Sequence, residues 1–478
     1  MHVLGRNRGQ VELLCLEAVV DAESPARQID GIIDGLDTSY FERSAVKDTG
    51  RPPYDPKDLL KLFVYGCDRG LRSSRRLNRE TKINVEVMWL LRGLQPDDKT
   101  ICNFRKENAE NLKRFFNEFV KRLKDADYID GKIVSVDGTK IRANNGKRNN
   151  YSVKKLDRLI DRIDSKIAGY MSELDKNDKI EELKERKAEY ESYKERIENG
   201  EVSEVSATDP DSRLMKQGNN GTDVSYNVQT AVDSKHKLIA GILVTNEPND
   251  QNQLHKVAKS VKANLGLKEM IVPADKGYYS TEDFKNCHED NITTIVPRPD
   301  DNNSDGVGFK KDRFEYDKEK DCYRCPAGRT LGFSYEDENG FRRYQNRKAC
   351  TDCALKKKCT NGIRRVITRH KFIEAAEKND RDFADNQHIY KQRQLLSEHP
   401  FGTVKRTMGV RQFLTMGLTN VTAETALIFL AYNLKRLRVI NKTNGDKDEG
   451  ALQLIRLFAG LFLISIIAAL TSKKLRPL

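Results

Sequence analysis

The sequence has little of what membrane and secreted proteins need. Only one of its apolar runs is long, the fourteen uncharged residues 457–470 near the C-terminus. That run is short for a bilayer span of about 20 residues, so it predicts a buried or partner-packed terminal helix rather than a membrane anchor. The N-terminus lacks the apolar segment and small-residue cleavage site of a signal peptide. We therefore expect a protein of the reducing cytoplasm, without a membrane partner.

Charge is plentiful, but its two signs are unequal. The 478 residues include 85 Lys and Arg against 72 Asp and Glu, a formal net charge of +13. Hydrophobic residues make up 37% of the chain and Phe alone numbers 18, which excludes a wholly disordered protein. A basic excess on a foldable chain favours a polyanionic partner, most often nucleic acid, although many basic proteins bind none.

Histidine is rare and cysteine is crowded. The seven histidines form no ligand pattern, whereas five of the nine cysteines fall in one short segment. Two Cys-x2-Cys pairs, Cys322 with Cys325 and Cys350 with Cys353, are separated by 24 residues, a spacing typical of a zinc ribbon. Four thiolates complete a tetrahedral site, so we expect structural Zn²⁺ with Cys359 as the surplus cysteine. Reduced metal-free thiols and redox-paired thiols are the alternatives.

Residues 1–130 have the apolar spacing and capping residues of short helices. One stretch in this region, residues 69–79, is basic without any acid, and its arginines are Arg69, Arg72, Arg75, Arg76 and Arg79. A further short helix is expected to begin at Asp97 or Asp98. Short helices with Arg, Asn and Thr side chains are typical of a helix-turn-helix-like DNA reader, in which the arginines contact phosphates. A solvated basic helical face is the alternative.

The segment 152–200 is highly charged but nearly neutral, with 12 basic and 13 acidic residues. Its apolar residues recur at alternating steps of four and three, which predicts a helical seam formed by Leu156, Ile160, Ile163, Ile167, Tyr170 and Leu174. A break at Asn177 and Asp178 would turn the segment into a helical hairpin. We expect a solvated spacer or a dimerisation arm rather than a site of chemistry.

Short β-branched runs alternate with helical stretches in the middle of the chain, which predicts a mixed α/β domain. The expected strands are residues 132–137, two strands of a hairpin within 224–246, residues 270–275 and residues 291–297. Asp137 and Asp275 each end one of these strands. Sites in open α/β sheets form beyond the carboxyl ends of strands, so the two aspartates can converge. With the later Glu398 they would supply the oxygen ligands that a pair of Mg²⁺ ions needs for phosphodiester displacement.

These residues occur in the order of a known signature. The sequence resembles a DDE (Asp-Asp-Glu) transposase of a bacterial insertion sequence, in the branch with a Tyr-Arg-Glu-Lys motif. The resemblance covers about residues 40–440 and rests on Asp137-Gly138-Thr139, Ala274-Asp275-Lys276-Gly277-Tyr278, the late residues Tyr390, Arg393, Glu398 and Lys405, and the later Ala431-Tyr432-Asn433-Leu434.

The resemblance implies a ribonuclease H-like catalytic core in which Asp137, Asp275 and Glu398 hold two Mg²⁺ ions, with Mn²⁺ able to replace them. It implies cleavage of double-stranded DNA at the terminal inverted repeats of the element, followed by attack of the freed 3′-hydroxyl on target DNA. Tyr390, Arg393 and Lys405 would contact phosphates. We also expect the protein to act as a homodimer on DNA and to be located at the nucleoid. We expect no small-molecule substrate.

The late motif departs from its commonest form at one point. Four residues, rather than three, separate Arg393 from Glu398, although the gap of six to Lys405 is kept. Pro400 disfavours helical backbone at the residue before it, so we expect the helix to end or kink near Glu398.

The predicted fold class is α/β, with a ribonuclease H-like mixed-sheet core. Its expected parts are a helical DNA-binding region at 1–130, a first part of the catalytic core at 131–300 with the helical hairpin inserted at 151–204, a Cys-rich zinc-ribbon-like insertion at 301–370, a second part of the core at 371–440, and a C-terminal apolar helix with a basic tail at 441–478. Two other functions fit the same residues: a DNA-binding factor whose acids are structural, and a metal-dependent nuclease that lacks strand transfer.

Overall fold

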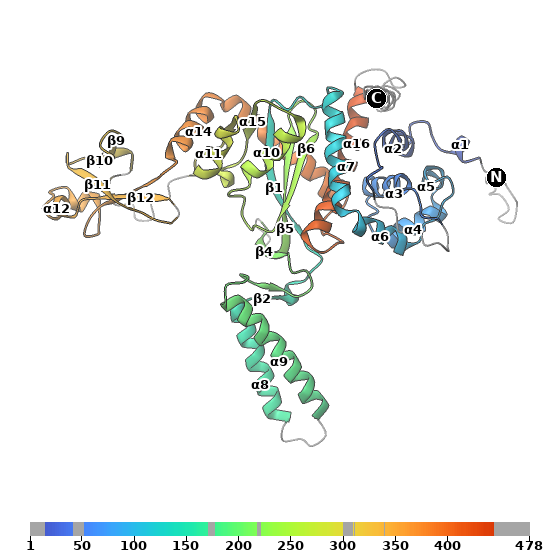
Figure 1. The fold of residues 1–478 in the computed structure, drawn as a ribbon, viewed down its shortest axis with the longest axis horizontal. Coiled ribbons are helices and arrows are strands. Elements are labelled where there is room, and N and C mark those ends of the chain that lie inside the picture. The colour runs from blue at the N-terminus through green and yellow to red at the C-terminus, as the bar shows by residue number, and fades with distance from the viewer. Residues whose placement is uncertain are drawn as a thin grey trace, which may run out of the picture. The chain divides into compact units, whose positions relative to one another are not determined.

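The computed structural model describes residues 15–41, 52–170, 177–217, 221–299, 309, 311–338 and 340–443 (Figure 1). The expected apolar helix at 457–470 lies outside this part of the chain. The described residues form two compact units. The first unit draws on residues within 1–249, 260–267 and 394–478, and the second on 250–259 and 268–393.

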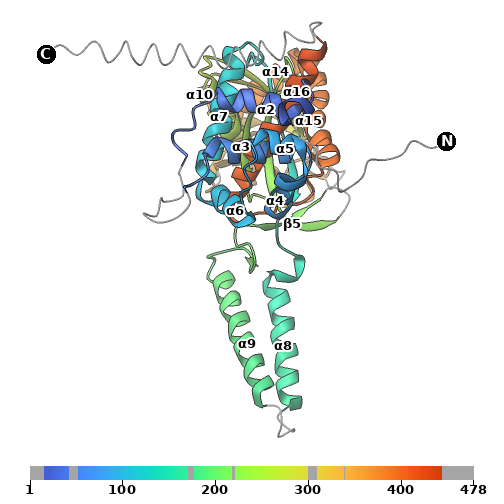
Figure 2. The ribbon, with the colours of Figure 1, turned by 90° about the vertical axis from the view of Figure 1, so that its right-hand side faces the viewer.

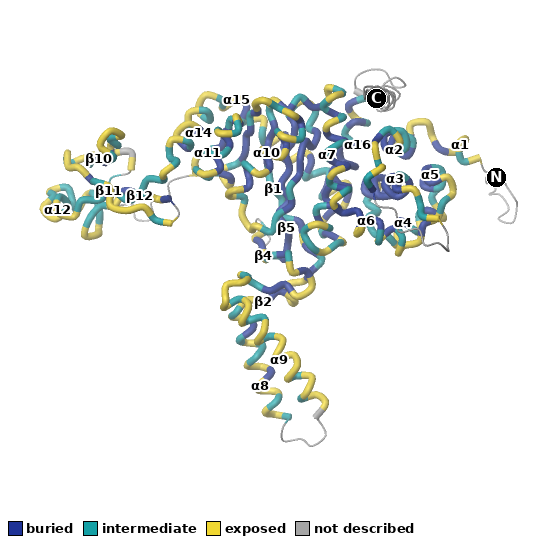
Figure 3. The backbone as a smooth tube through the Cα atoms, viewed as in Figure 1, coloured by how far each residue is buried: buried dark blue, intermediate teal, exposed yellow. Residues whose placement is uncertain are grey.

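The N-terminal part of the first unit is helical, as its sequence predicts. Its helices are α1 (Leu16–Val19), α2 (Pro25–Asp34), α3 (Pro56–Asp68), α4 (Ser74–Ile83), α5 (Val85–Leu90), α6 (Asp98–Glu107) and α7 (Ala109–Asp125). Side-chain caps start several of them: Asp55 accepts a hydrogen bond from the Lys57 amide before α3, and Asp97 from the Thr100 amide before α6. Helix α3 is buried along almost its whole length (Figure 3).

An antiparallel sheet follows, centred on β5 (Thr222–Asp233). Strand β1 (Val134–Arg142) pairs along one edge of β5, while β6 (Ile239–Thr245) and β4 (Arg213–Lys216) pair along the other. Thr230 illustrates the order, because it lies opposite Asp137 on β1 and opposite Ile242 on β6. The predicted hairpin within 224–246 is confirmed as β5 and β6.

The expectation that Asp137 ends its strand is wrong. Strand β1 continues for five residues beyond Asp137, and each of these residues has a partner on β5. Gly138, Thr139 and Lys140 carry no β-branched apolar pattern, so pairing with the long neighbour β5 decides the length of the strand rather than local propensity. Asp137 therefore lies in the middle of β1.

The long helix α16 (Leu418–Thr443) packs against α7, α3 and β6. The side-chain amide of Asn433 donates to the Ile239 carbonyl at 2.9 Å and accepts from the Ile239 amide at 2.8 Å. Tyr432 and Arg436 donate to the carbonyls of Lys237 and His236 in the hairpin turn. These four hydrogen bonds fix α16 to the hairpin of β5 and β6.

The charged segment forms two helices, α8 (Val153–Tyr170) and α9 (Asn177–Glu198), which lie side by side (Figures 1 and 2). The base of the pair contains η1 (Lys147–Asn149) and the two-stranded sheet of β2 (Asn150–Tyr151) and β3 (Val205–Ser206). Leu156 and Ile163 of the expected seam are buried. Ion pairs of Lys187 with Asp164 and of Lys194 with Asp157 cross between the helices.

The second unit contains a parallel pair of strands, β7 (Met270–Pro273) and β8 (Ile292–Ile295), joined through η2 (Lys276–Tyr278) and α11 (Thr281–Glu289). Helix α14 (Ile373–Asp385) packs on α11 and β8. Its buried Asn379 donates to the Val296 carbonyl at 2.8 Å and accepts from the Val296 amide at 3.1 Å. Helix α10 (Leu254–Leu265) has residues in both units.

A five-stranded antiparallel sheet forms the Cys-rich part of the second unit. Its strands follow the order β13-β12-β11-β10-β9, with β9 (Glu315–Asp317), β10 (Cys322–Arg324), β11 (Thr330–Glu336), β12 (Phe341–Gln345) and β13 (Val366–His370). The short helix η3 (Lys311–Arg313) precedes β9, and α12 (Arg347–Thr351) and α13 (Lys356–Cys359) lie between β12 and β13. Phe314, Tyr323, Leu331, Tyr344 and Ile367 form a small hydrophobic core.

The late motif lies on α15 (Gln387–Gly402), which is followed by the π-helical turn η4 (Thr403–Thr407). Of the two expected outcomes near Glu398, a helix end or a kink, the end does not occur, because α15 continues through Pro400 for two more residues. Proline removes one backbone donor from the ladder. The π-helical turn that follows changes the hydrogen-bond spacing, and the Thr403 hydroxyl donates to the His399 carbonyl at 3.1 Å. No helix in the described part of the chain is long and apolar enough to cross a membrane.

Candidate active site

One face of β1 carries Ser135, Asp137 and Thr139, because alternate residues of a strand point to the same side. Two contacts orient this face toward the late motif. The buried hydroxyls of Ser135 and Ser397 lie 3.3 Å apart, and Nζ of Lys405 donates a hydrogen bond to the Thr139 hydroxyl. The two contacts lie on either side of Asp137. Asp137 and the segment 397–405 therefore adjoin each other within the first unit.

Glu398 follows Ser397 directly and its side chain is exposed. Its Oε1 accepts a hydrogen bond from Nε2 of Gln394 at 2.9 Å, one helical turn earlier. Gln394 occupies the position, four residues before the glutamate, at which the commonest form of the motif has its arginine. His399 points elsewhere: its Nδ1 lies 2.9 Å from the Tyr432 hydroxyl of α16. Glu398 therefore lies on the helix whose buried Ser397 contacts the strand of Asp137.

Lys405 is half-buried beside this face. Its burial lowers the pKa of the ammonium group below the ordinary value for lysine. Its ammonium group donates a hydrogen bond to the Thr139 hydroxyl. Lys405 is thus a partly buried cation on the segment that adjoins the strand of Asp137.

Asp275 follows β7 as expected, but it belongs to the second unit. Its Oδ1 accepts from the Gly277 amide at 2.7 Å and so caps η2. A Cβ atom at Gly277 would lie 2.9 Å from Oδ1 of Asp275 and 3.8 Å from Oδ2 of Asp250. The glycine therefore lets the backbone pass between two carboxylates, and Asp250 is a neighbour of Asp275 that the sequence did not single out.

Tyr390 and Arg393 also belong to the second unit. The Tyr390 ring packs edge-on against Phe383 at a centroid distance of 5.0 Å. The Arg393 guanidinium lies over the Tyr390 ring at 5.7 Å. Both side chains are thus oriented by aromatic contacts, and they have the polar groups that a phosphate contact needs.

No group of three or more His, Cys, Asp or Glu side chains in the described residues is arranged to hold a metal ion. The three expected ligands divide between the two units, with Asp137 and Glu398 in one and Asp275 in the other. Carboxylate oxygens remain the donor set that Mg²⁺ prefers.

The arginines of residues 69–79 differ in their surroundings. The sequence assigned all five to DNA phosphates, and Arg72 does not fit this role. Its Nη1 lies 2.8 Å from Oε1 of Glu424, and both side chains are nearly buried, at 11% and 3% exposed. Nη2 of Arg72 also donates to the Gln412 carbonyl at 3.0 Å. This arginine therefore joins the N-terminal helices to α16, and its guanidinium is not available to DNA.

Arg69 is partly engaged as well, since it pairs with Glu86 at 3.0 Å and lies over the Tyr65 ring. Arg75, Arg76 and Arg79 are exposed on α4. Arg75 approaches Asp98 at the start of α6 at 3.7 Å. Of the exposed arginines, Arg75 thus lies next to the N-terminal end of α6, and α4 and α6 pack together.

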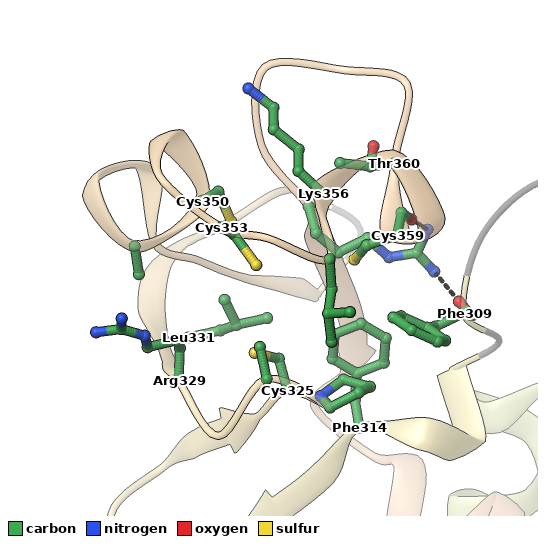
Figure 4. A pocket seen from close by; sticks show the side chains of 15 residues that line it. Phe309, Phe314, Cys325, Arg329, Leu331, Cys350, Cys353, Lys356, Cys359 and Thr360 are labelled. Carbon is green, nitrogen blue, oxygen red and sulfur yellow. Dashed lines mark hydrogen bonds between the residues drawn. The ribbon is translucent and has the colours of Figure 1, made fainter.

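The four cysteines that lie together in the structure are not the four that the sequence predicted as zinc ligands. Cys325, Cys350, Cys353 and Cys359 line one small cavity of about 30 Å³, and Cys322 is not among its lining residues (Figure 4). Burial raises the pKa of the Cys359 thiol, while Arg365 lowers it and the three other cysteines raise it further. Cys359, expected to be surplus, is therefore a close neighbour of the other three.

Two family models match separate segments of the chain. One, described as "Transposase domain (DUF772)", matches residues 14–107, which include the Arg-rich stretch. The other, described as "Transposase DDE domain", matches residues 324–438, which include Glu398 and Lys405. The protein is thus an enzyme that acts on DNA, of the transposase class.

More particularly, the chain is a DDE transposase of the insertion-sequence type, and its function is DNA transposition. Among solved structures, "Cryo-EM structure of piggyBac transposase synaptic complex with hairpin DNA (SNHP)" aligns over 94% of this chain and 82% of that chain, with 9% identity and a TM-score of 0.33. Comparison with curated proteins finds no match.

Proposed function

We propose that this transposase cuts and joins DNA at a Mg²⁺ site formed by Asp137, Asp275 and Glu398 on a ribonuclease H-like core. The observation that carries the proposal is the pair of contacts on either side of Asp137, from Ser397 to Ser135 and from Lys405 to Thr139. They bring the strand of one expected ligand against the segment of another. The antiparallel strands β1, β5 and β6 and the parallel pair β7 and β8 are compatible with such a core.

The proposed chemistry has two steps. In the first, a water oxygen attacks a phosphodiester at the element end, which frees a 3′-hydroxyl and leaves a 5′-phosphate. In the second, that 3′-hydroxyl attacks a target phosphodiester, and the target's own 3′-oxygen departs. Two Mg²⁺ ions, or Mn²⁺ in their place, would activate the attacking oxygen and stabilise the leaving oxygen. The carboxylates would hold these ions, and Lys405, Arg393 and Tyr390 would orient the phosphates.

We propose that the exposed arginines of α4 bind double-stranded DNA of the terminal inverted repeats. Arg75, Arg76 and Arg79 would neutralise phosphates, which is the usual source of salt-dependent affinity. The protein would act as a homodimer on DNA, with the α8 and α9 hairpin as a spacer or dimerisation arm, and would be located in the bacterial cytoplasm at the nucleoid. A structural Zn²⁺ in the Cys-rich segment would stabilise the small five-stranded sheet.

The test is cleavage and joining of DNA that carries the inverted repeats flanking the protein's own reading frame, with Mg²⁺ present. Asp137→Asn, Asp275→Asn and Glu398→Gln should each reduce cleavage by about 1,000-fold, since several kcal/mol of transition-state stabilisation depends on the metal. Asp178→Asn, an exposed acid on α9, is the matched control and should cut normally. Equal activity of wild type and the three variants would refute the site.

The joining reaction distinguishes a transposase from a nuclease that lacks strand transfer. A transposase transfers the cleaved 3′ end to a second duplex, whereas a nuclease releases it. Labelled 3′ ends should therefore appear in longer products when target DNA is added. Cleavage without any such product would favour the nuclease.

A further inference from the structure

We propose that the zinc ligands are Cys325, Cys350, Cys353 and Cys359, and that Cys322 is not a ligand. This assignment rests on the proposal that the Cys-rich segment holds structural zinc, but it does not depend on the proposed DNA chemistry. It replaces one member of the quartet that spacing alone predicts.

The first support is the shared cavity. The four cysteines approach it from different parts of the segment: Cys325 follows β10, Cys350 lies on α12, Cys353 follows α12, and Cys359 ends α13. Figure 4 shows their sulfur atoms around the same space. The cavity of about 30 Å³ has room for a single small ion or water, but not for a larger ligand.

The second support is the charge around the cavity. A Zn²⁺ ion with four thiolates carries a net charge of −2. Arg329, Lys356 and Arg365 line the cavity, and no Asp, Glu or His is among its lining residues. The three cations would offset the negative charge of a zinc ion with four thiolates. The charge around the cavity therefore suits an anionic metal cluster.

The third support is an unsatisfied donor. Nε of Arg365 is buried and has no hydrogen-bond acceptor among the described residues. The rest of the guanidinium is held in place, because Nη1 and Nη2 donate to the carbonyls of Cys359 and Phe309 and the group lies over the Phe314 ring. A buried N–H without an acceptor costs about 1–3 kcal/mol. A thiolate of Cys359 would be the acceptor that this donor lacks.

The backbone explains why Cys322 is left out. It lies on β10 next to Tyr323, whose side chain is in the small hydrophobic core, so strand alternation directs Cys322 to the opposite face of the sheet. Cys325 comes just after the strand, in a turn where its amide donates to the Arg329 carbonyl and its carbonyl accepts from Gly328. Gly328 has φ of +70°, which favours glycine there. Cys325 and Cys359, but not Cys322, pack against the core of Phe314 and Tyr323.

The four thiols are not arranged at ligand spacing in this structure. Zinc would have to draw them around itself, which is the usual coupling between metal binding and folding in small Cys-rich modules. The core beside them has only five buried residues, so such a module gains much of its stability from the metal.

The test measures zinc in the full-length protein purified under reducing conditions. Wild type and Cys322→Ser should contain about one zinc per chain, whereas Cys359→Ser should lose most of it. Cys359→His, which supplies an imidazole ligand, should recover it. Cys322→Ser is the matched control, because it removes a cysteine of the same segment.

A second measurement uses the wild-type protein and so does not depend on how the variants fold. Thiol alkylation followed by mass spectrometry is compared with and without a zinc chelator. Chelation should expose Cys325, Cys350, Cys353 and Cys359 to alkylation and leave Cys322 unchanged. Zinc-free wild type would overturn structural zinc altogether. Zinc loss in Cys322→Ser but not in Cys359→Ser, or chelator-dependent alkylation of Cys322 in place of Cys359, would overturn this ligand set alone.

Discussion

The Ser135 hydroxyl lies 3.3 Å from the Ser397 hydroxyl, and this buried contact holds the strand of Asp137 against the helix of Glu398. The two serines are 262 residues apart in the sequence. Ser397 directly precedes Glu398, and Ser135 lies on the same face of β1 as Asp137. Small hydroxyl side chains allow the strand and the helix to approach closely at this point.

Lys405 should matter more for activity than for stability. Burial lowers its pKa, so the charged form is disfavoured in the folded protein and Lys405→Met should not reduce the melting temperature. Loss of a charge-assisted phosphate contact should reduce DNA cleavage by about 10-fold to 100-fold. The neighbouring exposed Arg406 provides the control, and Arg406→Met should affect cleavage less. A large fall in melting temperature for Lys405→Met would contradict this prediction.

Arg72 and Arg76 should have separable roles. Arg72→Met leaves the buried Glu424 carboxylate without its cation and should cost about 3–5 kcal/mol in the free energy of unfolding. Arg76→Gln should leave stability unchanged and weaken DNA binding, with the slope of log affinity against log salt concentration reduced by about 0.9. Chemical denaturation and binding titrations at several salt concentrations check the two effects. The reverse pattern would show that Arg72 contacts DNA.

Asp233 should give stability a distinct dependence on pH. Burial raises its pKa to about 6, so the folded state favours the protonated form. The stability that this proton provides is present below the ordinary aspartate pKa and is lost as pH rises through about 6. Asp233→Asn removes this loss, so the variant should gain stability relative to wild type between about pH 4 and 7. A stability difference that stays constant across this range would contradict the assignment.

Local patterns predicted much of the secondary structure, but they did not predict contacts between distant residues. The strands β5 to β8 and the hairpin of α8 and α9 follow from β-branched runs and helical periodicity. The length of β1 does not, because pairing with β5 extends it past Asp137. Arg72 seemed to belong to a basic DNA-binding face, yet its partner Glu424 is 352 residues away in the sequence.

Motif order and local structure contribute differently to the candidate site. Asp137, Asp275 and Glu398 follow from motif order, whereas Gln394 beside Glu398 could have been found from its spacing of four residues on a helix. Cys359 could not be preferred to Cys322 from spacing, because Cys-x2-Cys pairs look complete without it. The face of β10 on which Cys322 lies becomes visible only when the strand and its core are placed.

The most direct test of the catalytic site locates the metal rather than the activity. Fe²⁺ bound in place of Mg²⁺ generates hydroxyl radicals in the presence of ascorbate and peroxide, and these cut the protein backbone close to the ion. The account predicts fragments that end near residues 137, 275 and 398, suppressed by excess Mg²⁺ and lost in Asp137→Asn. Fragments at other positions, or the same fragments in Asp137→Asn, would contradict it.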